Sequence, residues 1–255
     1  MAEQPGTVVV TGAASGIGEA TVRLLHARGH AVVLVDRDAA GLDRVAADLG
    51  GDRLRVVPAD VAAEADVAAY DRAAVEAFGR YDGVFLNAAV PGRFASLADT
   101  EVEEFDRVVA VDLRGVFLGL RAALRHFASR PGGGRIVTTS SVAGLTAGTG
   151  LAAYTGAKHG VIGLTRVAAV EGAPLGVRAN CLAPGMTDTP LQAPLKEFHG
   201  ESGAGAMVAG VPLGRLGQPS EAAELACFLL GPEAGYLTGA VIPIDGGALA
   251  ASPLG

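Results

Sequence analysis

The sequence predicts a single α/β domain in which a doubly wound parallel sheet carries helices on both faces. Short apolar runs alternate along the chain with stretches of helical periodicity, and this alternation is typical of a parallel sheet. Half of the 255 residues are hydrophobic, which is ample material for a large core. No linker, low-complexity block or repeat divides the sequence, so we expect residues 1–255 to form one domain.

The expected elements follow in order along the chain. Short apolar or β-branched runs predict strands at residues 7–10, 31–35, 54–57, 83–86, 135–139, 177–182 and 241–244. Apolar residues at helical spacing predict helices at residues 17–28, 67–78, 101–127, 153–171 and 221–230. Gly29 stands where the first helix should end, because glycine readily adopts the conformation that follows a helix C-terminus.

The composition excludes several classes of protein. With 20 basic and 27 acidic residues the net charge is −7, which argues against a nucleic-acid-binding protein. Only 18% of the residues are charged, so the chain is not of the disordered class. No apolar run approaches the ~18 residues of a membrane helix, and the first residues do not read as a signal peptide. We therefore expect a soluble cytoplasmic protein.

The cysteines and histidines do not indicate a disulfide framework or a metal site. Cys181 and Cys227 are too few for a disulfide scaffold. The five histidines form no cluster with ligand spacing, so no metal is expected.

A glycine-rich turn after the first strand predicts a phosphate-binding site. Its candidate contacts are Gly12, Ser15, Gly16, Ile17 and Gly18. Glycine lets the backbone approach a bulky anion, and the N-terminus of the following helix offers free N–H groups.

Asp36 stands at the end of the second expected strand. A carboxylate there can accept hydrogen bonds from the adenosine ribose and would repel a 2′-phosphate. Asp36 therefore favours NAD, whereas the neighbouring Arg37 could hold the phosphate of NADP.

Residues 186–210 interrupt the alternation of strands and helices with prolines, glycines and mixed side chains. A long connection inside a compact domain is often functional. We expect a substrate lid here, and an ordinary surface insertion is the alternative.

Several motifs in order give the chain a resemblance to the short-chain dehydrogenase/reductase family. They are T-G-x-x-x-G-I-G at residues 11–18, Y-x-x-x-K at 154–158, Ser141 thirteen residues earlier, and N-x-x-x-P-G-x-x-x-T at 180–189. The resemblance covers nearly the whole chain. It implies a Rossmann-like fold, a nicotinamide cofactor, an oxidoreductase acting on CH–OH groups, and a homotetramer.

The resemblance also implies further cofactor contacts. Asp60 would bind the adenine amine beside the backbone of Val61, and Asn87 would lie along the adenine ribose. Thr187 and Thr189 would hold the nicotinamide carboxamide.

Tyr154 and Lys158 suit acid–base chemistry on an alcohol. At positions i and i+4 they share one face of a helix, and a positive neighbour lowers the pKa of a phenol, ordinarily ~10. Tyr154 would take the proton of a secondary alcohol, or return it to a ketone, while Lys158 also holds the nicotinamide ribose. Ser141 would orient the substrate oxygen.

Asp112 departs from the resemblance, because the family usually has asparagine at this position, where it helps to hold a water linked to the lysine. A carboxylate there could pair with Lys158 and alter the pKa of the tyrosine. We expect activity to be retained, with Asp112 among the catalytic residues.

The hypothesis is thus an NAD-dependent oxidoreductase that interconverts a secondary alcohol and a ketone. The alternatives are an NADPH-dependent ketoreductase, for example on acyl chains, and a catalytically silent NAD-binding regulatory protein. The substrate walls are expected from residues 90–97, 142–153 and 186–210, with polar contacts from Arg93, Lys196, Glu197 and His199. These mostly small, apolar stretches favour a modest, largely nonpolar alcohol or ketone.

Overall fold

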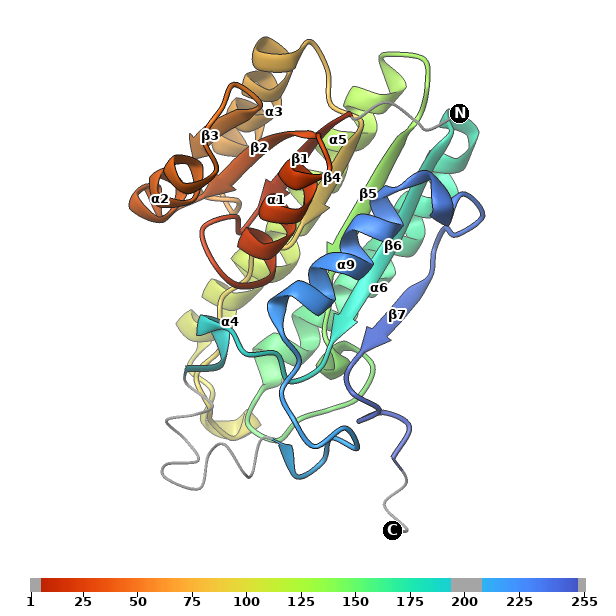
Figure 1. Cartoon of the computed structure of the whole chain (residues 1–255). Coiled ribbons are helices and arrows are strands. Elements are labelled where there is room, and N and C mark those ends of the chain that lie inside the picture. The colour runs from red at the N-terminus through yellow and green to blue at the C-terminus, as the bar shows by residue number, and fades with distance from the viewer. Residues whose placement is uncertain (1–5, 194–207, 252–255) are drawn as a thin grey trace.

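The computed structural model describes residues 6–193 and 208–251, which fold around one seven-stranded parallel sheet (Figure 1). The strand order is β3-β2-β1-β4-β5-β6-β7. The strands are β1 (Thr7–Thr11), β2 (Ala31–Asp36), β3 (Leu54–Pro58), β4 (Gly83–Leu86), β5 (Gly134–Thr139), β6 (Val177–Pro184) and β7 (Val241–Ile244). Each expected strand is found within two residues of its predicted ends, and the predicted fold class is confirmed.

Helices cover both faces of this sheet (Figure 1). They are α1 (Gly16–Ala27), α2 (Ala39–Leu49), α3 (Glu64–Phe78), α4 (Val102–Val109), α5 (Gly115–Ala128), α6 (Ala152–Gly172) and α9 (Pro219–Leu230). One core cluster joins α1, α2 and α9 to the sheet, and another joins α3, α5 and α6 to its opposite face. The central strands β1, β2 and β4 are buried almost throughout, which is why their sequences are nearly continuously apolar rather than alternating.

The sequence reading missed helix α2. Its apolar residues Leu42 and Val45 are fully buried and lie three positions apart, and the Asp38 side chain caps the helix by accepting a hydrogen bond from the Gly41 N–H at 3.0 Å. An aspartate before a short periodic segment is a helix-start signal.

The long helix expected at 101–127 is interrupted in the structure. A π-helical turn, Ala110–Arg114, lies between α4 and α5. Such a turn adds one residue to the helical repeat and is frequent at functional sites. It contains Asp112, which is completely buried.

The order in which strands are added to the sheet changes direction at β1. Strand β1 pairs with β2 on one side, where β3 follows, and with β4 on the other, where β5, β6 and β7 follow. In open α/β sheets the carboxyl ends of the strands at such a point border a ligand crevice. The cleft described below lies there.

The lid expected at 186–210 falls largely on residues 194–207, which lie outside the described part of the chain. Its first part includes a short 3₁₀ turn, Pro190–Gln192. The lid stays a prediction.

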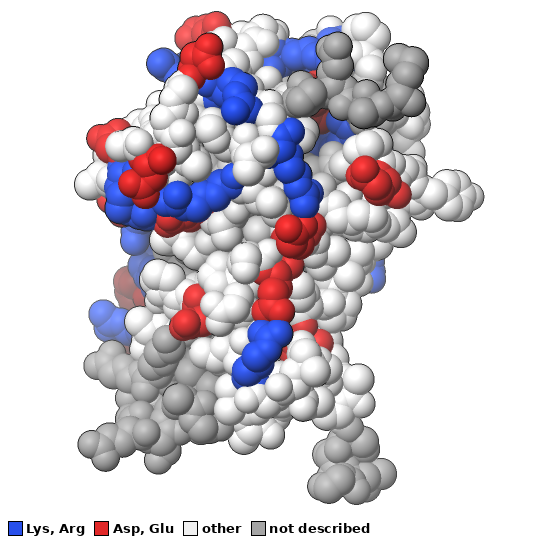
Figure 2. All heavy atoms as spheres, in the orientation of Figure 1, with Lys and Arg blue, Asp and Glu red and all other residues white. Residues whose placement is uncertain are grey.

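The surface carries charges of both signs, and Figure 2 shows acidic and basic side chains interspersed on one face. Among the helices of the described residues, none has the length and apolar character needed to cross a membrane.

Candidate active site

The turn between β1 and α1 is shaped by glycines. Gly12 and Gly16 both have positive φ angles, 70° and 53°. A Cβ atom on Gly12 would lie 2.9 Å from the Ala88 Cα, and one on Gly18 would collide with the Gly12 carbonyl oxygen. Glycine at these positions lets the backbone turn tightly enough to leave the first helical N–H groups accessible to an anion.

The Asp36 carboxylate is fixed to this turn. Its Oδ2 accepts a hydrogen bond from the Ala14 N–H at 3.1 Å, and its Oδ1 accepts one from the Asp38 N–H at 3.1 Å. The carboxylate is therefore held at the mouth of the cleft, where the sequence placed a ribose contact.

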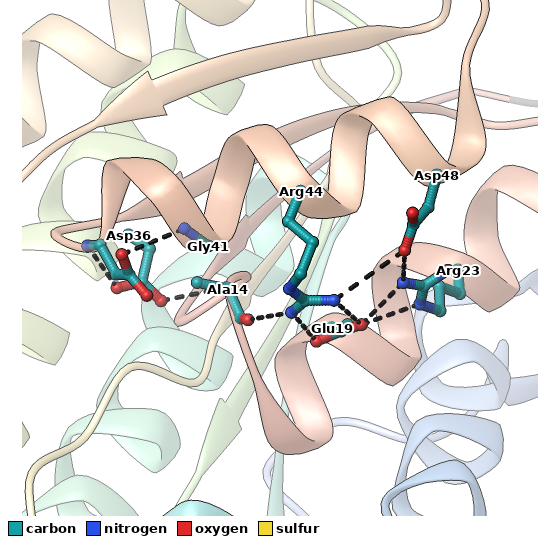
Figure 3. Close-up of polar contacts among 8 residues, drawn as sticks. Ala14, Glu19, Arg23, Asp36, Gly41, Arg44 and Asp48 are labelled. Carbon is teal, nitrogen blue, oxygen red and sulfur yellow. Dashed lines mark hydrogen bonds and ion pairs between the residues drawn. The ribbon is translucent and has the colours of Figure 1, made fainter.

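The carbonyl group of Ala14 is bound by an arginine that belongs to a network of ion pairs between helices α1 and α2 (Figure 3). The Arg44 guanidinium donates to the Ala14 carbonyl at 3.0 Å and to both carboxylate oxygens of Glu19, at 3.0 and 2.6 Å. Arg23 also donates to Glu19, at 2.8 Å. The positive charge of Arg44 is thus already paired. Sequence reasoning missed this network, because its residues come from two different helices.

Asn87 ties together the ends of three strands. Its side-chain amide donates to the Thr11 carbonyl at 3.3 Å, and its side-chain oxygen accepts from the Thr139 hydroxyl at 3.2 Å. The Thr11 hydroxyl in turn accepts the Asn87 N–H at 3.0 Å. Asn87 is therefore held rigidly beside the glycine turn.

The cleft has a volume of about 360 Å³ and includes nearly all predicted cofactor residues. Those lining it are Gly12, Ser15, Gly16, Ile17, Asp36, Arg37, Asp60, Val61, Asn87, Tyr154, Lys158, Thr187 and Thr189. Gly18 is absent from this lining, because it packs against Gly12 and shapes the turn from behind. The glycine cradle and the fixed carboxylate fit a dinucleotide.

Lys158 is buried at the base of the cleft, and three groups face its ammonium. Its Nζ lies 3.3 Å from the Asp112 Oδ2, donates a hydrogen bond to the Thr139 carbonyl at 3.2 Å, and stands 5.3 Å from the centre of the Tyr154 ring. The other oxygen of Asp112 accepts the Val90 N–H at 2.8 Å. The lysine side chain is 1% exposed and the aspartate 0%, so this is a buried ion pair.

The pKa values in this group are governed by burial and by the ion pair. Burial raises the pKa of Tyr154, the Lys158 ammonium opposes that shift, and the Asp112 carboxylate adds to it. Burial acts to lower the pKa of Lys158, but Asp112 and Tyr154 outweigh it, so the pKa is raised and the ammonium is retained. Lys158 acts to lower the pKa of Tyr154, as expected, but desolvation outweighs the lysine and the pKa is raised overall.

The two adjacent serines at the end of β5 have different surroundings. The Ser140 hydroxyl is turned to helix α6 and donates to the Lys158 carbonyl at 2.8 Å. The Ser141 hydroxyl accepts the Ala143 N–H at 3.1 Å and donates to the Pro184 carbonyl at 3.4 Å. Of the two serines, only Ser141 lines a second cavity together with Tyr154. Ser141, as predicted, is therefore the serine beside the tyrosine.

A second cavity of about 100 Å³ opens beside Ser141 and Tyr154, and we call it the substrate cavity. Its lining residues are Pro91, Gly92, Phe94, Ser141, Val142, Ala143, Leu151, Tyr154, Gly185, Met186, Leu191 and Gln192. Most are apolar, and most come from the three predicted wall segments. Arg93, expected as a polar contact, does not line this cavity, and Lys196, Glu197 and His199 lie outside the described residues.

No group of three or more His, Cys, Asp or Glu residues within 6–193 and 208–251 could hold a metal ion.

The comparison with protein families agrees with this geometry. A family model described as enoyl-(acyl carrier protein) reductase matches residues 12–248. The chain belongs to the short-chain dehydrogenase/reductase family. It is an oxidoreductase of nicotinamide cofactors that acts on CH–OH groups and interconverts secondary alcohols and ketones.

Individual proteins show how similar the chain is to known dehydrogenases and reductases. It is 46% identical to cis-4-hydroxycyclohexanecarboxylate dehydrogenase of Sinomonas cyclohexanicum, over 94% of each chain. The crystal structure of levodione reductase superposes with a TM-score of 0.92 at 39% identity, covering 97% of this chain and 98% of that one. The 3-ketoacyl-(acyl-carrier-protein) reductase from Brucella melitensis, complexed with NADH, gives 0.86 at 35% identity, covering 95% and 98%.

Proposed function

We propose that this dehydrogenase uses NAD and that Tyr154 is its general acid and base. The observation that carries the proposal is that Ser141 and Tyr154 line both the cofactor cleft and the substrate cavity. Lys158 lies behind the tyrosine ring, on the cofactor side. A substrate oxygen at this junction can reach both hydroxyl groups.

The residues then divide the chemistry of alcohol oxidation. The bound oxidised dinucleotide supplies the acceptor for the hydride that leaves the substrate carbon. The Ser141 hydroxyl donates a hydrogen bond to the substrate oxygen, and the Tyr154 oxygen takes the proton from that oxygen as the carbonyl forms. In the reverse direction Tyr154 returns the proton to the ketone oxygen. Lys158 favours the phenolate through its charge and holds the nicotinamide ribose.

The first test replaces the acid–base group. Tyr154→Phe removes the hydroxyl and keeps the ring beside Lys158, so we expect kcat for secondary-alcohol oxidation to fall about 10²- to 10⁴-fold. NAD binding, measured by titration calorimetry, should stay within about threefold of wild type. Wild-type turnover in the Tyr154→Phe variant would refute the assignment, and absence of turnover in the wild type would favour a silent binding protein.

The cofactor preference rests on Asp36. The turn and Asp38 hold its carboxylate in the cleft, where it would repel a 2′-phosphate. Arg44, the cation beside the turn, is engaged by Glu19. Arg37 lines the cleft and is the residue that favours the alternative, an NADPH-dependent ketoreductase.

The second test concerns this carboxylate. Asp36→Asn removes the negative charge and keeps the shape, so the ratio of kcat/KM with NAD to kcat/KM with NADP should fall at least tenfold, the effect of about 1.4 kcal/mol. The ratio is measured with one alcohol and both cofactors. Asp48→Asn, in the outer part of the charge network, is the control and should leave the ratio unchanged. A wild-type preference for NADP would contradict the proposal directly.

We also assign Asp112 a role through Lys158. Its carboxylate neutralises part of the ammonium charge that would otherwise act on Tyr154, and so it keeps the tyrosine's pKa higher. Because the partners are buried, removing one leaves an uncompensated charge. Asp112 is therefore a positioning residue that acts on the tyrosine through the lysine.

The third test uses the direction in which Asp112 shifts the pKa of Tyr154. In Asp112→Asn the negative charge that raises the pKa of Tyr154 is lost, so the pH profile of kcat/KM for alcohol oxidation should move to lower pH. A merely structural role would lower activity at every pH without moving the profile. A profile that stays in place would contradict the assignment, whereas a profile that moves to higher pH would show that Lys158 loses its charge together with its partner. Thermal unfolding of the variant controls for folding.

The substrate is proposed to be a small, largely nonpolar secondary alcohol or ketone built on a six-membered ring. The apolar lining and small volume of the substrate cavity support a compact ring. The Sinomonas relative is named as a dehydrogenase of a compound that contains a hydroxycyclohexane ring.

A homotetramer in the cytoplasm is proposed for the assembly and location. The outer face of α6 supports self-association, because Cβ atoms on Gly156 and Gly163 would meet nothing within 4 Å while Val167 and Val170 are 52% and 76% exposed. Exposed apolar patches of this kind mark interfaces. Light scattering in solution should give the mass of four chains, and the mass of one chain would refute the assembly.

A further inference from the structure

Gln192 is the polar side chain of the substrate cavity that the mechanism does not use. Apart from the catalytic pair Ser141 and Tyr154, the other described side chains of the lining are apolar or are glycines. Gln192 comes at the end of the short 3₁₀ turn Pro190–Gln192. It also borders the cofactor cleft, so it lies where the two spaces meet.

The backbone at Gln192 is fixed, whereas its side-chain amide is available. The Gln192 N–H donates to the Thr189 carbonyl at 3.1 Å. Within residues 6–193 and 208–251 the side-chain amide makes no hydrogen bond. When a ligand displaces water from an amide that borders an apolar cavity, binding becomes less favourable unless the ligand forms a hydrogen bond with that amide. The site should therefore bind more tightly a ligand that places a polar atom beside the Gln192 amide.

We propose that Gln192 binds a second oxygen of the substrate, and that the substrates are ring alcohols or ketones carrying a second hydroxyl or carbonyl oxygen away from the reacting carbon. This inference rests on the proposed function of the same site. A glutamine amide both donates and accepts hydrogen bonds, so it can bind a hydroxyl and a carbonyl oxygen alike.

The described part of the lining fits a neutral second oxygen. No Lys, Arg or His side chain belongs to the part of this lining that the structure describes, and a carboxylate held against apolar walls without a cation is costly. A neutral amide matches a neutral oxygen. The site should discriminate against an analogue that lacks the second oxygen, because that analogue leaves the Gln192 amide unpaired.

The experiment compares kcat/KM for cyclohexanol with kcat/KM for the 1,3- and 1,4-cyclohexanediols in the presence of NAD. In the wild type at least one diol should exceed cyclohexanol about tenfold, which corresponds to one hydrogen bond of about 1.4 kcal/mol. In Gln192→Met, which keeps the length and removes the amide, this preference should disappear, mainly through a higher KM for the diol. Turnover of cyclohexanol should be retained.

Leu191→Met is the matched control, because it places the same side chain at the neighbouring lining position. It should change kcat/KM for cyclohexanol and for the diols by the same factor. If Gln192→Met is inactive on cyclohexanol, Gln192→Asn replaces it, and the shorter amide should weaken the diol preference with cyclohexanol turnover intact. Loss of cyclohexanol turnover in both variants would make Gln192 structural and overturn the proposal.

Two further results would overturn the inference while leaving the proposed function intact. They are equal wild-type activity on cyclohexanol and the diols, and a diol preference that survives in Gln192→Met, whether or not the KM for NAD rises in that variant. A preference for 4-hydroxycyclohexanecarboxylate over both diols would exclude the neutral class. Failure of the wild type to oxidise any ring alcohol would instead refute the proposed ring substrate itself.

Discussion

The ammonium of Lys158 is the constraint around which the site is organised. A buried lysine remains charged only where other groups replace its water, and here these are the Asp112 carboxylate at 3.3 Å and the Thr139 carbonyl at 3.2 Å. These partners come from a π-helical turn and from the end of β5. The charge that acts on Tyr154 therefore depends on the sheet, on α6 and on the α4–α5 junction being assembled together.

The π-helical turn has a clear physical consequence at this junction. Its residue Asp112 binds the Val90 N–H with one oxygen and faces Lys158 with the other. The same carboxylate thus links the connection after β4 to the tyrosine helix. Because Val90 neighbours the substrate cavity residues Pro91 and Gly92, one carboxylate contacts both the segment that forms a wall of that cavity and the lysine beside Tyr154. Neither helical periodicity nor propensity reveals such a turn, which is why the sequence indicated one continuous helix.

The parts of the fold and site that the sequence predicted are those governed by local rules. Short apolar or β-branched runs mark the strands, so their limits were predicted to within two residues. The glycine turn and the Tyr154–Lys158 spacing are fixed by backbone geometry within one element. Helix α2 was missed although Asp38, Leu42 and Val45 carried its signals. The pairing of Arg44 with Glu19 and the partial burial of Tyr154 could not be predicted, because both depend on packing between segments remote in sequence.

The cofactor cleft and the substrate cavity differ in how far their ligands can be predicted from sequence motifs. The cofactor cleft is defined by backbone N–H groups, glycines and one carboxylate, and such features recur at fixed spacing after strands. The substrate cavity is formed by the connections after β4, β5 and β6, where side chains meet without any shared spacing. A motif can therefore indicate the reaction but not the substrate. What distinguishes one ring alcohol from another has to be sought in an individual side chain such as Gln192, whose amide has meaning only against the apolar walls around it.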